Sequence, residues 1–377
     1  MTKILPVVIF AMLMAIMSDN RSKYELDEYG IKRYISKEKF FYFVMAVVMA
    51  AFVGLRTGGN DTGVYRYGYE STLSGSRGFN SIDWTKISGA PGLSFVRVVL
   101  KTIGATTQDY FMVCSLFTIC TYLWFIKKHT CNIKLSVFMF ITMGGYTFAM
   151  AAIKQTMAVA FLMIASDNAI QKRWIRFLFW VIIGELFHPY AFIYLVVPFL
   201  TFSPWSNKSY LLIMGTIVIA FSLRTLLGAI DDVTSALGYD YSADSFTGSG
   251  VNIFRVLVVW VPVVISYFGR SDLQKSTNHE MNIIVNLTMM NALIMFIGLF
   301  GTANYFARLA NYFVIFQTLS VPWLLRYISP LNKSTVTIAA YIGYAGFFTY
   351  EMQFAHLPFD AQYNFVTVIN YLKHFVD

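Results

Sequence analysis

A carboxylate and an imidazole stand three residues apart in the segment Glu185-Leu-Phe-His188-Pro. At that spacing two side chains share one face of a helix. A carboxylate so placed can orient a histidine ring and raise its basicity, which is what a general base needs to take a proton from a hydroxyl group. A lone histidine in an apolar helix also commonly hydrogen-bonds a neighbouring helix, so Glu185 and His188 are catalytic candidates with a structural alternative.

Cationic side chains near the ends of apolar segments form a second group of candidates. They are Arg56, Lys154, Arg224, Arg255 and Arg308. A guanidinium stays charged when it is partly desolvated, and it binds phosphate oxygens through two parallel hydrogen bonds. Each cation could instead extend its charged end to a membrane interface. As a set, they favour a shared cavity for an anion.

Arg56 also opens a loop with the sequence Arg56-Thr-Gly-Gly-Asn-Asp61-Thr-Gly-Val-Tyr65-Arg66. Its glycines permit tight turns, and Tyr65 offers a flat ring with a hydroxyl group, which suits contact with a sugar. An interfacial tyrosine belt is the plainer explanation. Asp61 is a second candidate for a general base. The loop lacks the Gly-Lys-Ser/Thr of a nucleotide site and follows an apolar helix rather than a strand.

Metal and disulfide chemistry find no support in the residue spacing. No group of His, Asp or Glu has the spacing of a zinc or non-haem iron site. The cysteines Cys114, Cys120 and Cys131 lie in or beside apolar runs, where a thiol behaves as a small hydrophobic group. We therefore expect no protein-bound metal, no other cofactor and no disulfide framework.

The composition indicates which elements position these side chains. Of 377 residues, 57% are hydrophobic and only 13% are charged, whereas soluble domains have about 25% charged residues. Too little polar surface is left for a soluble multi-domain enzyme, and recurring apolar runs exclude disorder. We therefore predict an all-α, polytopic integral membrane protein with a single transmembrane domain over residues 1–377.

A helix needs about 20 mainly apolar residues to cross the hydrocarbon core, and somewhat shorter ones suffice when aromatic residues flank them. About twelve segments meet this description. They cover residues 4–17, 40–55, 108–126, 135–150, 152–166, 174–187, 190–202, 209–228, 252–269, 281–300, 305–325 and 335–350. The C-terminal residues 351–377 fit either an external amphipathic helix or a thirteenth span.

Lysines and arginines set the orientation, because short cytoplasmic loops are enriched in them. Segment 18–39 carries six, and placing it inside puts five later cationic loops inside as well. The acidic loop 229–251 then falls outside, as does the long loop 56–107 with a short amphipathic or re-entrant helix over 91–105. In this topology the candidate cations and the Glu185–His188 pair all lie in the outer leaflet, which predicts an outward-facing anion cavity.

Four motifs in succession carry a resemblance to a known family. They are Phe52-Val-Gly-Leu-Arg56 followed by Gly-Gly-Asn-Asp61-Thr-Gly-Val-Tyr65, then Ala151-Ala-Ile-Lys154-Gln155, then Leu186-Phe-His188-Pro-Tyr, and Ala307-Arg308-Leu-Ala-Asn-Tyr312. Over about residues 40–320 the chain resembles the Wzy-type O-antigen and capsule polymerases, and most closely their EpsG-like branch. Lys154 departs from the pattern, since relatives usually carry Arg before Gln, and a point charge loses the bidentate geometry.

The resemblance implies a fold similar to the lipid-dependent (GT-C-like) glycosyltransferases and an active site on the outer face of the bacterial cytoplasmic membrane. There a growing glycan passes from undecaprenyl diphosphate to the non-reducing end of a lipid-linked repeat unit, without nucleotide sugar or metal. The implied partners are that lipid-linked oligosaccharide, membrane lipids and a chain-length regulator protein, with no nucleic acid. The expected diphosphate and glycan contacts are Arg56, Lys154, Arg255, Arg308, Arg224, Tyr65, Arg66, Gln155 and Tyr312.

Other functions stay open at this point. A flippase or transporter of lipid-linked oligosaccharide needs cationic groups reachable from both sides, whereas the inner halves of the predicted helices carry almost no charge. An O-antigen ligase shares the carrier chemistry but typically has a larger external loop between later helices than 229–251. An acyltransferase is a more distant alternative.

Overall fold

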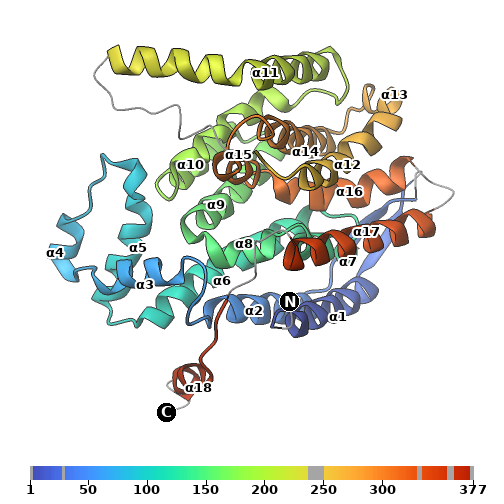
Figure 1. Ribbon diagram of the computed structural model, residues 1–377. Helices are drawn as coiled ribbons and strands as arrows, with labels where there is room; N and C mark the ends of the chain where they lie inside the picture. The colour runs from blue at the N-terminus through green and yellow to red at the C-terminus, as the bar shows by residue number, and fades with distance from the viewer. Residues whose placement is uncertain (1–2, 28–29, 237–249, 329–332, 355–360, 374–377) are drawn as a thin grey trace. The chain divides into compact units, whose positions relative to one another are not determined.

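The computed structural model describes residues 3–27, 30–236, 250–328, 333–354 and 361–373 (Figure 1). The described chain is mostly helical. Its internal contacts divide it into two compact units. Unit 1 comprises Met1–Asp27, Lys32–Leu195 and Ile338–Asp377, and unit 2 comprises Glu28–Ile31 and Val196–Thr337.

Unit 1 is a helical bundle around α6 (Thr107–His129). Helix α6 begins with a capping box, in which the Thr106 hydroxyl accepts the Asp109 N–H and the Asp109 carboxylate accepts the Thr106 N–H. This exchange satisfies two backbone donors that a helix start otherwise leaves unpaired. The helices that pack on α6 or on one another around it are α1 (Leu5–Arg21), α2 (Phe40–Gly54), α9 (Ile153–Ile170) and α10 (Trp174–Glu185).

The predicted span 135–150 is broken in the structure. It forms α7 (Ile133–Thr142) and α8 (Gly145–Ala151), whose axes differ by 45°. Gly144 between them has φ +83°, a left-handed backbone conformation that residues other than glycine rarely adopt. Hydropathy averaged over the run does not reveal such a break. The predicted span 305–325 is likewise divided, into α15 (Ala303–Ala310) and α16 (Val314–Ile328).

The predicted external loop 56–107 is mainly helical. Three short helices stand together beside the start of α6 (Figure 1). With twelve residues, the helix predicted over 91–105 is too short to cross a bilayer. The elements are α3 (Thr62–Glu70), α4 (Gly75–Asn80), the 3-10 turn η1 (Ile87–Gly89) and α5 (Pro91–Thr102).

The end of the chain returns to this region. Helix α17 (Lys333–Gln353) precedes residues 355–360, which lie outside the described residues, and α18 (Phe365–Lys373) follows. Helix α18 has nine residues, about half of what a crossing helix needs. The Tyr371 hydroxyl donates to the Asp109 carboxylate at 2.7 Å, which ties α18 to the start of α6.

A two-stranded antiparallel sheet adds to the helical fold that the sequence predicts. Strands β1 (Lys23–Leu26) and β2 (Lys32–Ser36) pair with Tyr24 opposite Tyr34. The cations in this segment indicated the topology, but they gave no sign of the alternating strand pattern.

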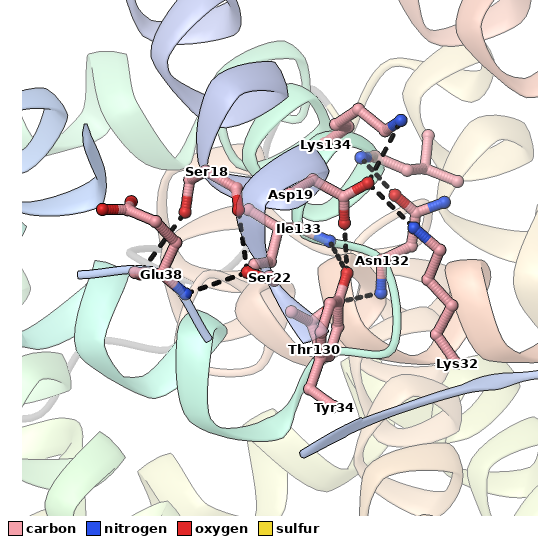
Figure 2. A network of polar contacts seen from close by, with 11 residues as sticks. Ser18, Asp19, Ser22, Lys32, Tyr34, Glu38, Thr130, Asn132, Ile133 and Lys134 are labelled. Carbon is pink, nitrogen blue, oxygen red and sulfur yellow. Dashed lines mark hydrogen bonds and ion pairs between the residues drawn. The ribbon is translucent and has the colours of Figure 1, made fainter. Parts of the chain in front are cut away.

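Beside this hairpin, the buried carboxylate of Asp19 contacts three side chains (Figure 2). Asp19, which is 1% exposed, accepts hydrogen bonds from Lys32 at 2.9 Å and from the Tyr34 hydroxyl, and it pairs with Lys134 at 3.1 Å. The Tyr34 oxygen in turn accepts the Ile133 N–H at 3.3 Å, so α1, β2 and the start of α7 are joined at one point.

Unit 2 is built around α14 (His279–Ile297), which contacts four other helices of the unit. Buried amides link them: Asn291 donates to the Ala310 carbonyl and accepts from Gln317, both at 2.6 Å. The surrounding helices are α11 (Asn207–Ala236), α12 (Ile253–Phe268), α13 (Arg270–Leu273), α15 and α16. The 3-10 helix η2 (Pro189–Leu200) and α17 each include a boundary between the units.

The helices fit a polytopic membrane protein. Each of the twelve predicted segments overlaps a helix. Within the described ranges, α6 and α14 are long and apolar enough to cross a membrane, and α7 with α8 makes a third if the bent pair is one span. Shorter apolar helices are Phe40–Gly54, Pro189–Leu200, Asn207–Leu223, Ile253–Phe268 and Val314–Leu325. The predicted loop 229–251 begins inside α11, and its residues 237–249 lie outside the described residues.

Candidate functional site

Arg56 lies two residues beyond the end of α2 and is 1% exposed. Its Nη1 donates to the Val53 carbonyl at 2.6 Å and its Nε to the Thr62 hydroxyl at 3.1 Å, while the Phe111 ring lies 4.9 Å from the guanidinium carbon. The Nη2 atom is buried and has no hydrogen-bond partner among the described residues. Arg56 therefore fastens the start of α3 to the end of α2 and leaves a positive charge beneath the loop between them.

Arg66 on α3 is the more accessible guanidinium of this loop, with its side chain 34% exposed. Its Nη2 donates to the Thr57 carbonyl at 3.1 Å, and its Nη1 lies 3.9 Å from a carboxylate oxygen of Glu70. The guanidinium carbon is 5.9 Å from the centre of the same Phe111 ring that contacts Arg56. Two guanidinium groups therefore share one aromatic ring, whose quadrupole attracts cations.

The start of α9 approaches α3 through Tyr65. This tyrosine is 7% exposed, and its hydroxyl accepts the backbone N–H of Lys154 at 3.3 Å. The half-buried Lys154 side chain makes no ion pair or hydrogen bond within the described residues, and Gln155 beside it is buried. The sequence-predicted residues Arg56, Tyr65, Arg66, Lys154 and Gln155 are thus brought together in unit 1.

Arg97 on α5 joins this group, although the sequence pattern predicts for it only a place on an amphipathic helix. Its Nε donates to the Tyr110 hydroxyl at 3.4 Å, and its charge is close enough to act on Lys154 and Tyr65. Gly68 on α3 makes room for it, since a Cβ there would lie 2.9 Å from Nη2. The pairing of Gly68 with Arg97 is a tertiary contact that no local pattern contains.

Arg56, Arg66, Arg97 and Lys154 are called the cation cluster below. In the part of the chain that the structure describes, the acid ion-paired with any of them is Glu70, at the long distance of 3.9 Å. A weakly compensated group of cations attracts a multiply charged anion. Asp61, at the start of α3, is exposed, and its carboxylate has no hydrogen bond or ion pair among the described residues.

The Glu185–His188 pair is arranged differently from the sequence expectation. Helix α10 ends at Glu185, and His188 lies in the turn that follows, where its N–H donates to the Gly184 carbonyl at 3.2 Å. The Glu185 carboxylate accepts the Phe192 N–H at 3.0 Å, and the imidazole ring lies 5.2 Å from that of Tyr190. The Gly92 N–H donates to the Leu186 carbonyl at 2.8 Å, so α5 touches this turn at its start.

An open polar cleft borders the cation cluster. Its volume is about 610 Å³, and it is lined by Thr57, Arg66, Gln362, Tyr363 and Asn364. Thr57 belongs to the loop after α2 and Arg66 to α3, and the other three residues come from the C-terminal segment before α18. We call this hollow the polar cleft.

The remaining predicted residues lie in unit 2. Arg255 is in the first turn of α12, whose N-terminus is capped by Asn252, and Arg308 is an exposed residue of α15. Tyr312 follows α15 and is fully buried. Arg224 lies in α11, and its side chain is outside the described residues.

The ends of α12, α14 and α15 meet in unit 2. The Val251 N–H donates to the Gly298 carbonyl at 2.8 Å, and a Cβ on Gly298 would lie 2.9 Å from Phe306. This junction brings together the elements that carry Arg255 and Arg308.

A model of the EpsG family matches residues 39–366, which include the cation cluster, the polar cleft and most of unit 2. This chain belongs to the EpsG family. That family is a Wzy-like polymerase family and is associated with membranes. Comparison with curated proteins and with solved structures gave no match. The EpsG match begins at Lys39, so α1 and the β1–β2 hairpin precede it.

Proposed function

We propose that this EpsG-family protein is a polysaccharide polymerase of the bacterial cytoplasmic membrane. It transfers a growing glycan from undecaprenyl diphosphate to the non-reducing end of a lipid-linked oligosaccharide repeat unit on the outer face. The observation that supports this reaction is the cation cluster, whose single described acid partner is Glu70 at 3.9 Å. A diphosphate leaving group carries the charge that such a cluster would hold.

In this reaction the bond between the anomeric carbon and the diphosphate oxygen breaks, and the acceptor hydroxyl oxygen forms the new glycosidic bond. The hydroxyl proton passes to a base, and the diphosphate leaves with the bonding electron pair. Fixed cations stabilise the charge that develops on the leaving oxygen. Arg66 and Lys154 are exposed enough to contact it. The buried Arg56 acts through its field and by holding the loop, not by contact.

Two residues are candidates for the base. Asp61 has a carboxylate without a described partner at the start of α3, next to Tyr65. His188 lies in the turn that α5 contacts through Gly92, and five residues of helix, about 7.5 Å along the axis, separate Gly92 from Arg97. We propose Asp61 or His188 in this role, with Glu185 shaping the turn through its bond to Phe192.

The charge distribution supports the proposed orientation. If the β1–β2 segment and its lysines lie inside and the chain crosses the membrane twelve times, the cation cluster lies on the outer side. A GT-C-like arrangement, contact with membrane lipids and a chain-length regulator as partner belong to the same proposal. Arg255, Arg308, Arg224 and Tyr312 stay predicted substrate contacts in unit 2.

Reconstitution tests the proposal directly. Purified protein in liposomes, supplied with one defined lipid-linked repeat unit, should form dimers and longer products. Arg97→Ala and Lys154→Ala should each slow dimer formation roughly 10- to 150-fold, because one charge-assisted hydrogen bond contributes about 1.5–3 kcal/mol. Lys86→Ala is the matched control, since this lysine side chain is 78% exposed and its ion pair is with Asp83 at 3.8 Å.

Wild-type protein that binds the substrate without elongating it would overturn the polymerase assignment. Gene deletion separates the main rival: loss of a polymerase leaves single repeat units on the cell surface, whereas loss of a flippase leaves none. Full activity in both cluster variants would overturn the role given to the cation cluster.

A further inference from the structure

The C-terminal segment is attached to the loop after α2 through backbone atoms. The Thr57 N–H donates to the Gln362 carbonyl at 2.8 Å, and the Gln362 N–H donates to the Gly58 carbonyl at 2.9 Å. The Asn364 N–H donates to the Thr57 hydroxyl at 2.9 Å. The result is a short antiparallel bridge between residues about three hundred positions apart in the sequence.

Tyr363, between the two amide residues, anchors the segment from its other side. Its hydroxyl donates to the Phe52 carbonyl at 2.8 Å, and its ring lies 4.9 Å from that of Phe52. The attachment therefore depends on main-chain groups, on the Thr57 hydroxyl and on Tyr363. It does not require the amide side chain of Gln362, which is exposed and has no hydrogen-bond partner among the described residues.

Gly58 provides the space for that amide. A Cβ at this position would lie 3.0 Å from Gln362 Oε1, closer than ordinary van der Waals contact. The glycine, the amide and the wall of the polar cleft thus meet at one point. The Gln362 amide lies at the cleft, and it makes no hydrogen bond among the described residues that would stabilise the fold.

The cleft offers the chemistry that recognises sugars. Amide groups donate and accept hydrogen bonds, as ring hydroxyls do, and a tyrosine ring presents an apolar face. Its volume of about 610 Å³ falls within the roughly 300–1,000 Å³ of small-molecule sites. Arg66 in its wall adds a fixed positive charge on the side of the cation cluster.

We propose that the polar cleft is a saccharide subsite. It binds sugar rings of the lipid-linked substrate through Gln362, Asn364 and Tyr363, while Arg66 holds the charged group next to those rings. This assignment rests on the proposed polymerase function for the identity of the substrate. It adds residues of the C-terminal segment, in which none of the site residues predicted from the sequence lies.

Two probes separate the sugar from its carrier. One is the repeat-unit oligosaccharide released by mild acid from the cell's own lipid-linked pool, and the other is undecaprenyl diphosphate without sugar. The double variant Gln362→Ala with Asn364→Ala should bind the oligosaccharide roughly 10- to 30-fold more weakly, as expected for two lost hydrogen bonds. Its affinity for undecaprenyl diphosphate should stay within about twofold of wild type, because the backbone bridge is kept and the bond lost from Asn364 Oδ1, which accepts the Val366 N–H at 3.1 Å, lies at the start of α18.

Asn370→Ala is the matched control, since Asn370 is an exposed amide residue of α18 outside the cleft. It should bind both probes as the wild type does. Gly58→Ala supplies an independent variant, because it displaces the Gln362 amide without removing it, and it should also weaken oligosaccharide binding selectively.

Wild-type affinity for the oligosaccharide in the double variant would overturn the saccharide subsite. An equal loss of both probes would also overturn it, because that result indicates collapse of the loop. These binding measurements do not require turnover. A protein that binds the oligosaccharide through Gln362 and Asn364 but never elongates it would refute the polymerase proposal and leave the subsite standing.

Discussion

Arg66→Ala should separate catalytic loss from loss of stability. Among the described residues this guanidinium donates a hydrogen bond to Thr57, pairs with Glu70 at 3.9 Å and lies 5.9 Å from the Phe111 ring. An exposed pair four residues apart contributes about 0.3–0.5 kcal/mol, and the hydrogen bond about 1 kcal/mol. A ring near the 6 Å limit adds about 0.5 kcal/mol. The free energy of unfolding should therefore fall by about 2 kcal/mol at most.

The activity should fall further. A lost charge-assisted hydrogen bond to a phosphate corresponds to about 1.5–3 kcal/mol, so the rate of dimer formation should drop roughly 10- to 150-fold. The assay is the initial rate in liposomes with a defined lipid-linked repeat unit, with thermal unfolding measured on the same preparations. Because the contact is ionic and partly exposed, the wild-type rate should also decrease with added salt more steeply than that of the variant.

Glu70→Gln is the informative partner of this variant. It removes the acid paired with Arg66 and keeps the hydrogen bond of that arginine to Thr57. The lost Arg66–Glu70 ion pair contributes about 0.4 kcal/mol. Arg66 no longer loses this energy when it binds the lipid-linked substrate, so KM should fall about twofold. The reasoning is refuted if Arg66→Ala retains more than half of the wild-type rate, or if Glu70→Gln loses as much activity as Arg66→Ala.

Two further predictions concern other parts of the chain. Arg308→Ala should slow polymerisation more than His188→Ala, because loss of the diphosphate is the step that most needs stabilisation; a full ladder of polymer lengths in cells with Arg308→Ala present in the membrane would contradict this. Burial acts to raise the pKa of the Asp19 carboxyl, but hydrogen bonds from Tyr34 and Lys32 outweigh it and hold that pKa below the ordinary 3.8. The unfolded chain therefore binds the proton more readily, so stability should be complete above about pH 4 and fall at lower pH, and Asp19→Asn should remove this part of the acid sensitivity in thermal unfolding scans.

The membrane helices were the most predictable feature, because an apolar run long enough to cross a bilayer is visible in the sequence itself. The details within the runs were not. Gly144 breaks one predicted span by its backbone conformation, which an average over neighbouring hydropathies cannot detect. The β1–β2 hairpin was missed because its lysines and arginines were interpreted only as an orientation signal.

For the candidate site the sequence suggests residue types, but it does not indicate their geometry. Arg56 was expected to contact the substrate, but burial is a tertiary property, and the structure encloses this side chain. Glu185 and His188 have helical spacing, but the sequence does not reveal that α10 ends at Glu185 or that its carboxylate accepts the Phe192 N–H. Arg97 entered the cluster through its fit over Gly68, and Gln362 through a bridge to a loop far away in the sequence.

Unit 1 is formed from both ends of the chain, with unit 2 inserted between them. Thr57 is synthesised early, and its partner Gln362 follows 305 residues later. The wall of the polar cleft is therefore completed only after the chain has been synthesised as far as Asn364. A nascent or prematurely terminated chain can carry the complete cation cluster and still lack the segment that forms this wall, so the cluster can form before the polar cleft does.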